Sequence, residues 1–379
     1  MTRTLVHVLD HIPFIRRSGE DFFLAMAERL QAMGWRTIHV IAGEPCEFFR
    51  TRLGELGLPY LVGPFPLTRA NAKTLGQQLR AYEPDVLQTT FISPFSIPLQ
   101  TLKGACGARC LVVNDHSGGQ PSQKTGVKRL LARLRGTMVG AQIDHVVALS
   151  EYIRRRDVEE LYLPAAKVRV IPLGINTERF SPVSREANGT LTIAYAGRLI
   201  PEKGVWCLLH AIRDLVREQS LPAFRVLLAG EGKLAGELKQ FCDDNELRQV
   251  EFVGQISGMP QFLAEADIVV VPSEIDESFG LVVVEAMACG ACVIGSDAGA
   301  IPELVGPGGL AGLIFHRGDL ADLKQNLKMC INDAHCRNRL AAAARNRVMK
   351  LFSLSHTVDQ YARLYEEIEA SLSPRRVAS

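Results

Sequence analysis

The sequence predicts an α/β protein built from two parallel-sheet domains. Short apolar runs alternate with helical patterns through the first half of the chain, and the alternation starts again after a polar segment at residues 183–190. Strands that alternate with helices form parallel sheets covered by helices on both faces. A chain of 379 residues is long enough for two hydrophobic cores. We therefore expect one domain at residues 1–182 and a second at residues 183–353.

The composition is that of an ordinary globular protein, with 47% hydrophobic and 22% charged residues. A formal net charge of +2 gives no indication of a nucleic-acid partner. Residues 1–10 do not resemble a signal peptide, because Asp10 and His11 interrupt the apolar run, and no apolar run is long enough to cross a bilayer. Nine scattered cysteines fit a reducing compartment better than a disulfide framework, so we expect a cytoplasmic protein.

Cys289 and Cys292 have the spacing of a redox pair. They stand where a predicted helix ends and the apolar run at residues 291–295 begins, and no second pair completes a zinc site. We interpret both as small buried core residues. No Asp-x-Asp element follows a predicted strand, and we expect no bound metal.

The first half contains six predicted strands, each an apolar run between turn residues. They are residues 5–9, 37–42, 85–88, 110–114, 145–150 and 168–172. The clearest helix covers residues 22–33, where Phe23, Met26, Ala27 and Leu30 share one face. Because ligands of parallel sheets bind at the carboxyl ends of the strands, the loops after these strands hold the candidate site residues.

Two of those loops carry candidates. Gly19 lies just before a helix and would let the backbone approach a phosphate, but Ser18 as an ordinary helix N-cap explains the segment equally well. His116 stands between a strand end and the pair Gly118-Gly119, a position that favours a functional side chain. Since a single histidine is more often structural, both interpretations of His116 stay open.

Residues 120–143 are basic, with no acidic residue between Asp115 and Asp144. Leucines at positions 130, 131 and 134 are interleaved at helical spacing with the cations. The cations named as a possible lipid contact are Lys124, Lys128, Arg129, Arg133 and Arg135. A basic helix with an apolar stripe suits an anionic membrane surface. A helix that packs on its own sheet with its charges in water explains the pattern equally well.

The second half repeats the alternation of strands and helices. Its predicted strands are residues 191–196, 225–229, 250–253, 268–271, 291–295 and 312–315. Helices fit between them, such as residues 204–218, whose Leu208, Leu209, Ile212 and Leu215 face inward. We expect the last helix, residues 354–372, to return to the first domain.

A turn and a helix start follow the strand at residues 268–271, with Gly280 opening the helix and Gly290 closing it. A helix N-terminus offers unpaired N–H groups and a positive dipole end, which suit a phosphate. Glu277 and Glu285 flank this start and would repel a phosphate, but they suit the hydroxyl groups of a sugar and of a ribose respectively. The segment therefore indicates a nucleotide-sugar, although acids at a helix start are also common for their effect on the dipole.

Arg198 and Lys203 lie on the loop after the first strand of the second half. Arginine supplies a fixed planar charge and lysine a mobile point charge. Together they suit a diphosphate, whereas either one alone could be an ordinary surface charge. The glycine turns at Gly230 and Gly254, after the next two strands, are weaker indications of a close approach to a ligand.

The segment from Glu277 to Glu285 resembles the paired-glutamate signature of retaining glycosyltransferases of the family-4 type, with Phe-Gly after the first glutamate. The resemblance implies the GT-B architecture of two Rossmann-like domains and a metal-independent reaction without a cofactor. It implies catalytic roles for Arg198, Lys203, Glu277 and His116. The implied donor-binding residues also include Gly19, Gly230, Gly254, Ser278, Phe279, Gly280, Leu281 and Glu285. The nucleotide-sugar is then a substrate, by default a UDP- or GDP-linked sugar.

Three positions depart from the family pattern. Ser18-Gly19 has one glycine where two are usual, Thr90 stands where a histidine is common, and Ala300 replaces a usual glycine. Two of the three lie in the N-terminal half, which would hold the acceptor and departs most from the family pattern.

We expect a retaining hexosyltransferase that moves a sugar from a nucleotide diphosphate to an acceptor hydroxyl. The resemblance implies a place in glycan, glycolipid or cell-envelope polysaccharide biosynthesis, in the cytoplasm or peripherally on the inner face of the membrane. A sugar-nucleotide epimerase of the same architecture is an alternative, but it would need acid and base groups on both faces of the sugar. A non-catalytic sugar-nucleotide binding protein is a third hypothesis, which the complete polar site disfavours.

Overall fold

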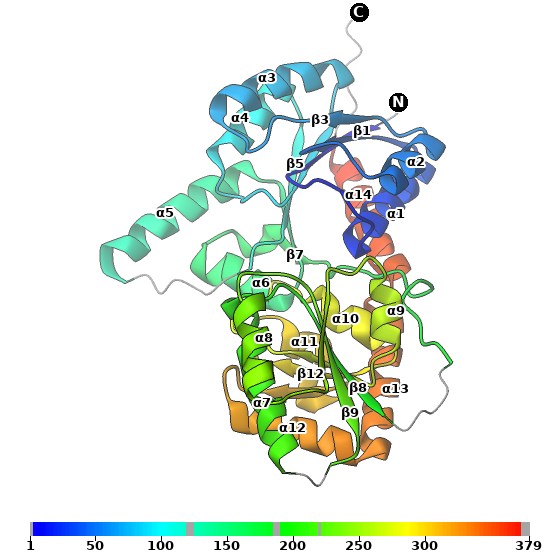
Figure 1. Ribbon diagram of the computed structural model, residues 1–379. Helices are drawn as coiled ribbons and strands as arrows, with labels where there is room; N and C mark the ends of the chain where they lie inside the picture. Colours follow the sequence, from blue (N-terminus) through cyan, green and yellow to red (C-terminus); the bar gives the residue numbers. More distant parts are fainter. Residues whose placement is uncertain (1–2, 119–124, 185–189, 219–220, 373–379) are drawn as a thin grey trace, which may run out of the picture. The chain divides into compact units, whose positions relative to one another are not determined.

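The computed structural model describes residues 3–118, 125–184, 190–218 and 221–372, and the chain divides into two compact units. Unit 1 contains residues 3–117, 125–174 and the last helix, and unit 2 contains Gly118 and residues 175–353 apart from the gaps just given. Each unit has a parallel sheet with helices on both faces (Figure 1). The predicted fold class, α/β with two parallel sheets, is confirmed.

Unit 1 has a seven-stranded sheet in the order β3-β2-β1-β4-β5-β6-β7, parallel throughout. Its strands are β1 (Arg3–Leu9), β2 (Trp35–Ile41), β3 (Tyr60–Val62), β4 (Val86–Thr90), β5 (Cys110–Asp115), β6 (His145–Ala148) and β7 (Val168–Val170). The strand β3 is not among the strands predicted from the sequence. This edge strand has three residues, none of them fully buried, and such a short run carries no detectable alternation.

Helices cover both faces of the unit 1 sheet. They are α1 (Ser18–Ala32), α2 (Glu47–Glu55), α3 (Arg69–Leu79), α4 (Ile97–Cys106), α5 (Gly126–Gln142), α6 (Glu151–Arg155) and α14 (Leu354–Ser371). The chain after α6 continues as a π-helical segment, Arg156–Glu160. In β1, Val6 and Val8 belong to the apolar cluster under α3 and α4, while His7 contacts Phe23 of α1. Alternate residues of a strand thus serve opposite faces, as the pleat requires.

Unit 2 has a six-stranded parallel sheet in the order β10-β9-β8-β11-β12-β13. All six predicted strands are present. They are β8 (Leu191–Ala196), β9 (Phe224–Ala229), β10 (Val250–Gly254), β11 (Ile268–Val271), β12 (Cys292–Ser296) and β13 (Leu313–Phe315). The central strands are almost entirely buried, which explains their continuous apolar runs.

One continuous apolar cluster fills the space between the unit 2 sheet and the helices α7, α8 and α12. The helices of this unit are α7 (Val205–Arg217), α8 (Ala235–Asp244), α9 (Met259–Ala264), α10 (Leu281–Ala288), α11 (Ile301–Val305), α12 (Leu320–Asn332) and α13 (Ala334–Leu351). Cys289 and Cys292 are free and buried, and the Cys292 Sγ lies 3.7 Å from the Cys330 Sγ. The interpretation of this pair as core residues is confirmed.

The chain passes from unit 1 to unit 2 between Gly174 and Ile175, eight residues before the boundary set in the sequence analysis. The reason is packing. The Ile175 N–H donates to the carbonyl of Phe352 at 2.9 Å, and Phe180 is buried with its carbonyl bound by Arg345 at 2.7 Å. The polar linker that served as the sequence boundary, residues 183–190, lies partly outside the described residues.

The last helix, α14, belongs to unit 1. Its Tyr361 and Tyr365 are fully buried there, and the Thr357 hydroxyl donates to the carbonyl of Pro172 at 3.0 Å. In the parts of the chain that the structure describes, no helix combines the length and apolarity needed to cross a bilayer.

Candidate functional site

The strand order of unit 2 reverses between β8 and β11, which lie side by side. From β8 the chain builds outward through β9 and β10, then crosses back to β11 and continues to β12 and β13. Ligands of open parallel sheets bind at the carboxyl ends of the strands beside such a reversal. Two loops start there: residues 197–204 with Arg198 and Lys203, and residues 272–280 with Glu277.

Backbone contacts fix these two loops against each other. The carbonyl of Glu202 accepts hydrogen bonds from the N–H groups of Glu274 at 3.0 Å and Ile275 at 3.2 Å. Gly204 has a φ of +66°, and a Cβ at this position would stand 1.8 Å from the carbonyl oxygen of Pro272. Because only glycine tolerates both the backbone conformation and the contact, Gly204 allows the approach that brings the loops together.

Lys203 and Glu277 form an ion pair across the two loops. The Lys203 Nζ lies 2.5 Å from the Glu277 Oε1, and the Ser273 hydroxyl donates to the same oxygen at 2.6 Å. The two charged side chains are 22% and 18% exposed. A lysine ammonium has three donors, and a carboxylate has two acceptor oxygens. Among the described residues nothing donates to the Glu277 Oε2, so both groups keep hydrogen-bonding capacity for a polar ligand.

Arg198 is the second cation of the site. Its side chain is exposed, and its guanidinium makes no hydrogen bond or ion pair with any described residue. Its carbonyl is fixed by the Tyr195 hydroxyl, which donates to it at 2.7 Å. Burial and the charge of Glu277 raise the pKa of Tyr195, so this hydroxyl keeps its proton at neutral pH. The loop after β8 therefore presents a guanidinium whose donors bind none of the described residues.

The turns after β9 and β10 support the loop after β8 from its other side. A Cβ at Gly230, whose φ is +137°, would stand 1.8 Å from the carbonyl oxygen of Gly197. The Gly230 N–H donates to the carbonyl of Gly254 at 2.8 Å. The structure thus brings Gly230 and Gly254 together at the carboxyl edge, and their contact with a donor stays a prediction.

The helix α10 begins at Leu281, after Gly280 with a φ of +97°, and Gly290 follows its end with a φ of +80°. The predicted glycine boundaries are therefore confirmed, although the β-branched residues 282–284 favour a strand locally. Ser278 precedes this start in the turn after β11. The first N–H groups of α10 consequently face the carboxyl edge of the sheet, close in sequence to Glu277.

Two predicted donor residues of this segment are buried. Phe279 is 2% exposed and packs edge-on against Phe352 with ring centroids 5.9 Å apart, so only its backbone can line a site. Glu285, in the second turn of α10, is 6% exposed. Burial together with the charge of Glu285 raises the pKa of Cys289 to about 12. Glu285 is thus a largely enclosed carboxylate, separated from Glu277 by the first turn of the helix.

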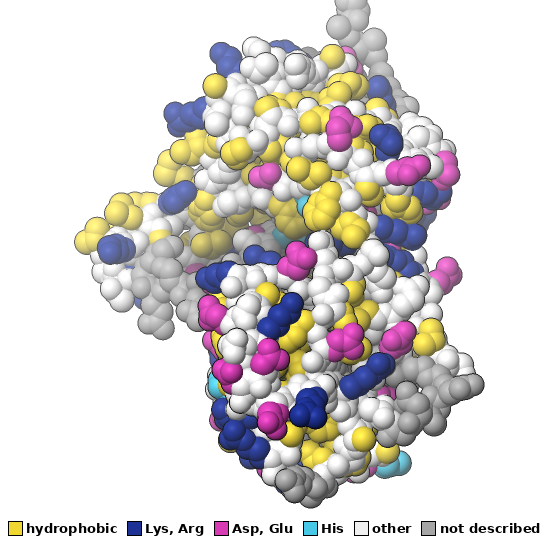
Figure 2. Space-filling view, in the orientation of Figure 1, with side chains coloured by type: hydrophobic (Ala, Val, Ile, Leu, Met, Phe, Trp, Pro, Cys, Tyr) yellow, Lys and Arg dark blue, Asp and Glu magenta, His cyan; other side chains and the backbone are white. Residues whose placement is uncertain are grey.

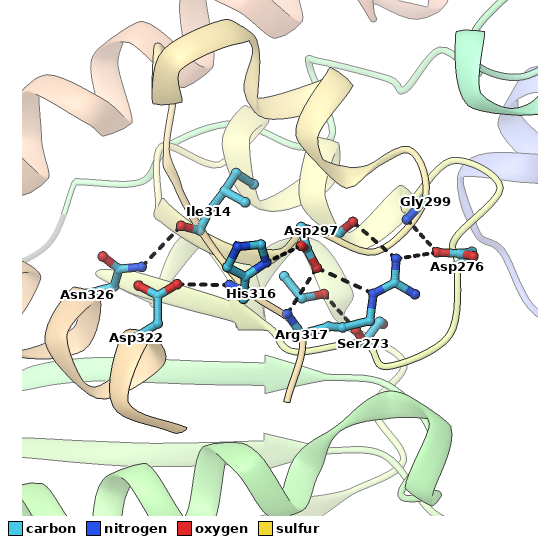
Figure 3. A network of polar contacts seen from close by, with 10 residues as sticks. Ser273, Asp276, Asp297, Gly299, Ile314, His316, Arg317, Asp322 and Asn326 are labelled. Atoms are coloured by element: carbon cyan, nitrogen blue, oxygen red, sulfur yellow. Dashed lines mark hydrogen bonds and ion pairs between the residues drawn. The ribbon is translucent and has the colours of Figure 1, made fainter. Parts of the chain in front are cut away.

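A second polar network holds the Glu277 loop, as Figure 3 shows. The Arg317 guanidinium lies 2.7 Å from the Asp276 Oδ1, and the Arg317 N–H donates to the Asp297 Oδ1 at 3.0 Å. The Asp276 Oδ1 also accepts from the Gly299 N–H at 3.0 Å. Arg317 follows β13, Asp276 follows β11 and Asp297 follows β12. One arginine therefore joins three loops at the carboxyl edge beside Glu277.

His316 extends this network to the surface. Its Nδ1 lies 2.7 Å from the Asp297 Oδ2, and its side chain is 82% exposed. Burial alone would raise the pKa of Asp297, but hydrogen bonds from the Arg317 backbone and from His316 lower it overall. Asp297 is therefore ionised at neutral pH, and its charge helps to hold Arg317 in place.

In unit 1, His116 lies at the carboxyl end of β5. Its ring packs edge-on against Phe91 with centroids 4.6 Å apart, and its Nε2 is buried without a partner among the described residues. Burial lowers the pKa of His116 to about 4; the charge of Asp115 opposes this effect and His11 adds to it. The imidazole is therefore neutral at physiological pH and has a free ring nitrogen for a hydrogen bond.

The loop of His116 is held by Arg156. This guanidinium binds the Asp115 Oδ2 at 2.8 Å, the Ser117 carbonyl at 2.5 Å and the Ser117 hydroxyl at 2.9 Å. Arg156 is the first residue of the π-helical segment and is 9% exposed. A buried guanidinium shared among these acceptors fixes the backbone on both sides of His116.

The start of α1 differs from its prediction. Arg17 is the N-cap and Ser18 the first helical residue, because the Glu20 Oε2 accepts from the Arg17 N–H at 2.9 Å and closes a capping box. The Glu20 Oε1 also lies 2.8 Å from the His11 Nε2. The N-cap at Ser18 is therefore wrong by one residue. Gly19 occupies the second helical position, beside a carboxylate that already binds the helix start.

Two family models match this chain. Residues 19–179 match the family model described as Glycosyltransferase Family 4, and residues 176–347 match the model described as Glycosyl transferases group 1. The two matched regions overlap at residues 176–179 and together span residues 19–347, which include most of both units. The chain belongs to the family-4 glycosyltransferases.

Relatives with curated descriptions support the family. An uncharacterised glycosyltransferase of Methanocaldococcus jannaschii is 31% identical over 227 residues, 59% of this chain and 60% of that protein. A GDP-mannose-dependent monoacylated alpha-(1-6)-phosphatidylinositol monomannoside mannosyltransferase of Corynebacterium glutamicum is 26% identical over 301 residues, 74% of this chain and 76% of that protein. A phosphatidyl-myo-inositol mannosyltransferase of Mycobacterium tuberculosis is 29% identical over 245 residues, 62% of each chain. The family-4 chain thus matches about three fifths to three quarters of these relatives' lengths.

Solved structures show the GT-B fold for this family-4 chain. A glycosyltransferase from Rickettsia africae superposes with a TM-score of 0.80 at 18% identity, covering 98% of this chain and all of that one. HepE of Anabaena, in complex with UDP and glucose, gives a TM-score of 0.76 at 21% identity, covering 96% and 99% of the two chains. Identities this low establish a shared fold and no shared substrate.

Sequence reasoning for this family-4 chain missed Asp276, Arg317 and Arg156 as residues that hold the site. Arg317 stands 41 positions after Asp276, and no local spacing links the two. One signal could have grouped Asp276 with Arg317. They follow β11 and β13, and the carboxyl ends of strands in one parallel sheet lie at the same edge. Arg156 gives no such signal, because the π-helical turn that aims it has no sequence pattern.

Proposed function

We propose that this chain is a retaining glycosyltransferase that transfers a sugar from a nucleotide-diphosphate sugar to an acceptor hydroxyl. One observation carries the proposal: at the reversal of strand order in unit 2, one loop carries the cations Arg198 and Lys203, and Lys203 pairs with Glu277 on the other loop. This arrangement suits a ligand with a diphosphate next to a polyhydroxylated ring. The proposed process is glycan, glycolipid or cell-envelope polysaccharide biosynthesis.

The diphosphate is assigned to Arg198 and Lys203. The unused guanidinium of Arg198 can bind two phosphate oxygens at once, and Lys203 has two N–H donors beyond the one that faces Glu277. The first N–H groups of α10, after Gly280, add a partial positive charge at the same edge. Because these groups supply positive charge without a metal ion, the proposal includes neither a metal nor another cofactor.

The hydroxyl groups of the donor are assigned to the two glutamates. The Glu277 Oε1 is occupied by Lys203 and Ser273, which leaves the Oε2 to accept from hydroxyls of the transferred sugar. Glu285 is assigned to the ribose, where an enclosed carboxylate can accept from a diol. The backbone around Ser278 and Leu281 would line the donor, and Gly19 is proposed only as a point of close backbone approach.

The reaction we propose keeps the anomeric configuration. The acceptor oxygen attacks the anomeric carbon on the face from which the diphosphate departs, the bond from carbon to phosphate oxygen breaks, and the hydroxyl proton passes to the departing phosphate. Arg198 and Lys203 stabilise the charge that develops on that phosphate, which is where preorganised cations lower a barrier most. His116, neutral and with a free ring nitrogen, is assigned a hydrogen bond to a sugar hydroxyl.

The donor nucleotide is proposed to be UDP or GDP. HepE was solved with UDP-glucose, and the Corynebacterium glutamicum relative is GDP-mannose-dependent, so the related proteins support both bases and a hexose. Several relatives have phosphatidylinositol-based names, which supports a glycolipid acceptor. We propose a cytoplasmic location, because that is where nucleotide-sugars are made available to such an acceptor.

The test begins with thermal shift of the purified chain against UDP- and GDP-hexoses, because a ligand of the folded state raises the melting temperature. Each stabilising donor is then incubated with and without phosphatidylinositol, and the products are identified by NMR. We expect slow hydrolysis of the donor alone and a glycoside with the donor's anomeric configuration when acceptor is present. Inverted product would exclude the proposed mechanism. Conversion of the donor to an epimer without acceptor would overturn transfer itself.

A further inference from the structure

The helix α5 (Gly126–Gln142) carries an unusual share of the exposed apolar side chains. Among the described residues fifteen large hydrophobic side chains are exposed, and five of them lie on this helix. They are Val127 (73%), Leu130 (59%), Leu131 (59%), Leu134 (54%) and Met138 (67%). Figure 1 shows α5 extending away from the unit 1 sheet, and Figure 2 shows hydrophobic side chains gathered on its surface.

These five residues form one stripe, since they recur at intervals of three and four. The face of α5 that packs on its own unit is a different one. A Cβ at Gly136 would stand 2.0 Å from the carbonyl oxygen of Leu161, and one at Gly140 would stand 2.3 Å from the Cδ of Pro164. At about 100° per residue, the two glycines lie roughly opposite the centre of the stripe. The packing of α5 therefore turns its apolar stripe outward.

The charged residues of α5 are all cationic. Lys128, Arg129, Arg133 and Arg135 lie on the described helix, and no acidic residue occurs between Asp115 and Asp144. Lys124, the fifth predicted cation, lies outside the described residues. Lys128 and Arg135 lie beside the apolar stripe, about a quarter turn from its centre. A helix with an apolar stripe and a cationic border suits a membrane interface that carries negative charge.

A groove of about 600 Å³ opens beside the same border of α5. Its apolar lining includes Phe95, Leu131 and Leu161, and its charged lining consists of Lys128 and Arg135 with the single carboxylate of Glu160. The Arg135 Cζ lies over the Phe95 ring, 5.0 Å from the ring centroid, as in a cation–π contact. This lining suits a lipid headgroup, because two cations can bind its phosphate and apolar side chains can contact its glycerol region.

We propose that α5 docks unit 1 on an anionic phospholipid bilayer, with the stripe Val127, Leu130, Leu131, Leu134 and Met138 inserted at the interface and Lys128 and Arg135 contacting headgroup phosphates. The inference does not depend on the donor site, since every residue that carries it lies in unit 1. Attachment is reversible, because an interfacial helix of this size lacks the anchoring of a spanning segment.

Sedimentation with vesicles tests the proposal on the full-length chain. Vesicles of phosphatidylcholine alone are compared with vesicles that also contain phosphatidylglycerol, at low and high salt. We expect strong binding to the anionic vesicles at low salt and a loss of roughly tenfold or more at high salt, because screening weakens surface attraction. Equal sedimentation with neutral and anionic vesicles would overturn the proposal.

Two double variants separate the apolar and the electrostatic contributions to vesicle binding. Leu130→Ser/Leu134→Ser should abolish binding to the anionic vesicles, and Lys128→Gln/Arg135→Gln should lower that binding by roughly tenfold. Leu310→Ser/Leu351→Ser, on exposed leucines of unit 2, is the matched control and should bind as the parent. Wild-type binding by the α5 leucine variant contradicts the inference. A dimer of the parent that this variant dissociates, without vesicle binding, would instead identify the stripe as a contact between copies.

Discussion

The Lys203 Nζ lies 2.5 Å from the Glu277 Oε1, and this ion pair joins the two loops at the strand-order reversal of unit 2. Arg198, on the same loop as Lys203, makes no hydrogen bond or ion pair with any described residue. The two cations therefore differ in what they do before a ligand arrives. Lys203 holds the Glu277 carboxylate in place, whereas the Arg198 guanidinium binds none of the described residues.

Replacing Arg198 by Ala should lower kcat/KM for the donor without changing the melting temperature. The loss should be about 2–4 kcal/mol in transition-state free energy, the scale for a preorganised group that stabilises developing charge. Lys203→Ala should lose a similar amount and also lower the melting temperature, because it leaves the half-buried Glu277 without its counter-ion. Donor kinetics and calorimetry measure both effects. Arg217→Ala, at the far end of α7, is the control; wild-type kinetics for Arg198→Ala would remove it from the site.

Arg317 should act on the reaction through Asp276, without contacting substrate. Arg317→Ala releases the loop that carries Glu277, so we expect kcat to fall by roughly tenfold or more while the KM for the donor changes less, since the phosphate cations stay in place. Arg317→Lys should restore part of kcat, because an ammonium reaches one carboxylate but cannot join three loops. Steady-state kinetics decide this. Equal losses for the Ala and Lys variants, matched by equal loss of melting temperature, would reduce Arg317 to a stabilising role.

The strands and helices of unit 2 were predictable because burial dominates there. Strands such as β11 are enclosed on both faces and read as continuous apolar runs, and Gly280 and Gly290 mark helix ends by their backbone conformation. The Lys203–Glu277 pair was predicted as two neighbours of one ligand but not as partners of each other. Sequence spacing shows which loops share an edge, and it does not show which side chains meet there.

Unit 1 was less predictable because its decisive contacts are long-range and polar. Thr90 stands where a histidine is common in the family. Its hydroxyl forms a hydrogen bond with the His7 Nε2 at 2.9 Å and accepts one from the Asn114 Nδ2 at 2.9 Å. Asn114 in turn accepts from Tyr361 of α14 at 3.2 Å, across 247 residues. Nothing near Thr90 in the sequence indicates these partners. The last helix, α14, was expected in unit 1, but its polar contacts with the sheet were not.

Asp157→Asn should stabilise unit 1 at alkaline pH. Burial and the charge of Asp115 raise the pKa of Asp157 to about 8, so the folded state binds a proton that the unfolded state, with a pKa near 3.8, has lost. The stability that this proton contributes therefore disappears as the pH rises from 3.8 through about 8. An amide needs no such proton. In urea unfolding, the free energy of unfolding of the variant should increase relative to that of the parent as the pH rises. A difference that does not change with pH would mean that Asp157 is ionised in the folded state.

Two buried histidines give unit 1 the opposite pH dependence. His7 and His39 lie with ring centroids 5.6 Å apart, both fully buried, and neither ring nitrogen of His39 has a partner among the described residues. Burial lowers the pKa of His39 from 6.5 to about 4. Burial, with the nearby His39 and His116, lowers the pKa of His7 as well. Both side chains are neutral in the folded state at physiological pH.

Replacing His39 by Leu should stabilise the chain, and more so in acid. Below pH 6.5 the unfolded state protonates His39 and the folded state does not, so folding loses stability until about pH 4, where both states bind the proton. At about pH 5 this costs about 2 kcal/mol, which the variant avoids. Near neutral pH the stability of the variant should equal or exceed that of the parent, because an apolar side chain replaces buried nitrogens that bind none of the described residues. Urea unfolding at both pH values measures the change, with His335→Leu on the surface of α13 as control. A His39 variant whose stability falls in acid as steeply as the parent's would show that His39 already carries its proton in the folded state.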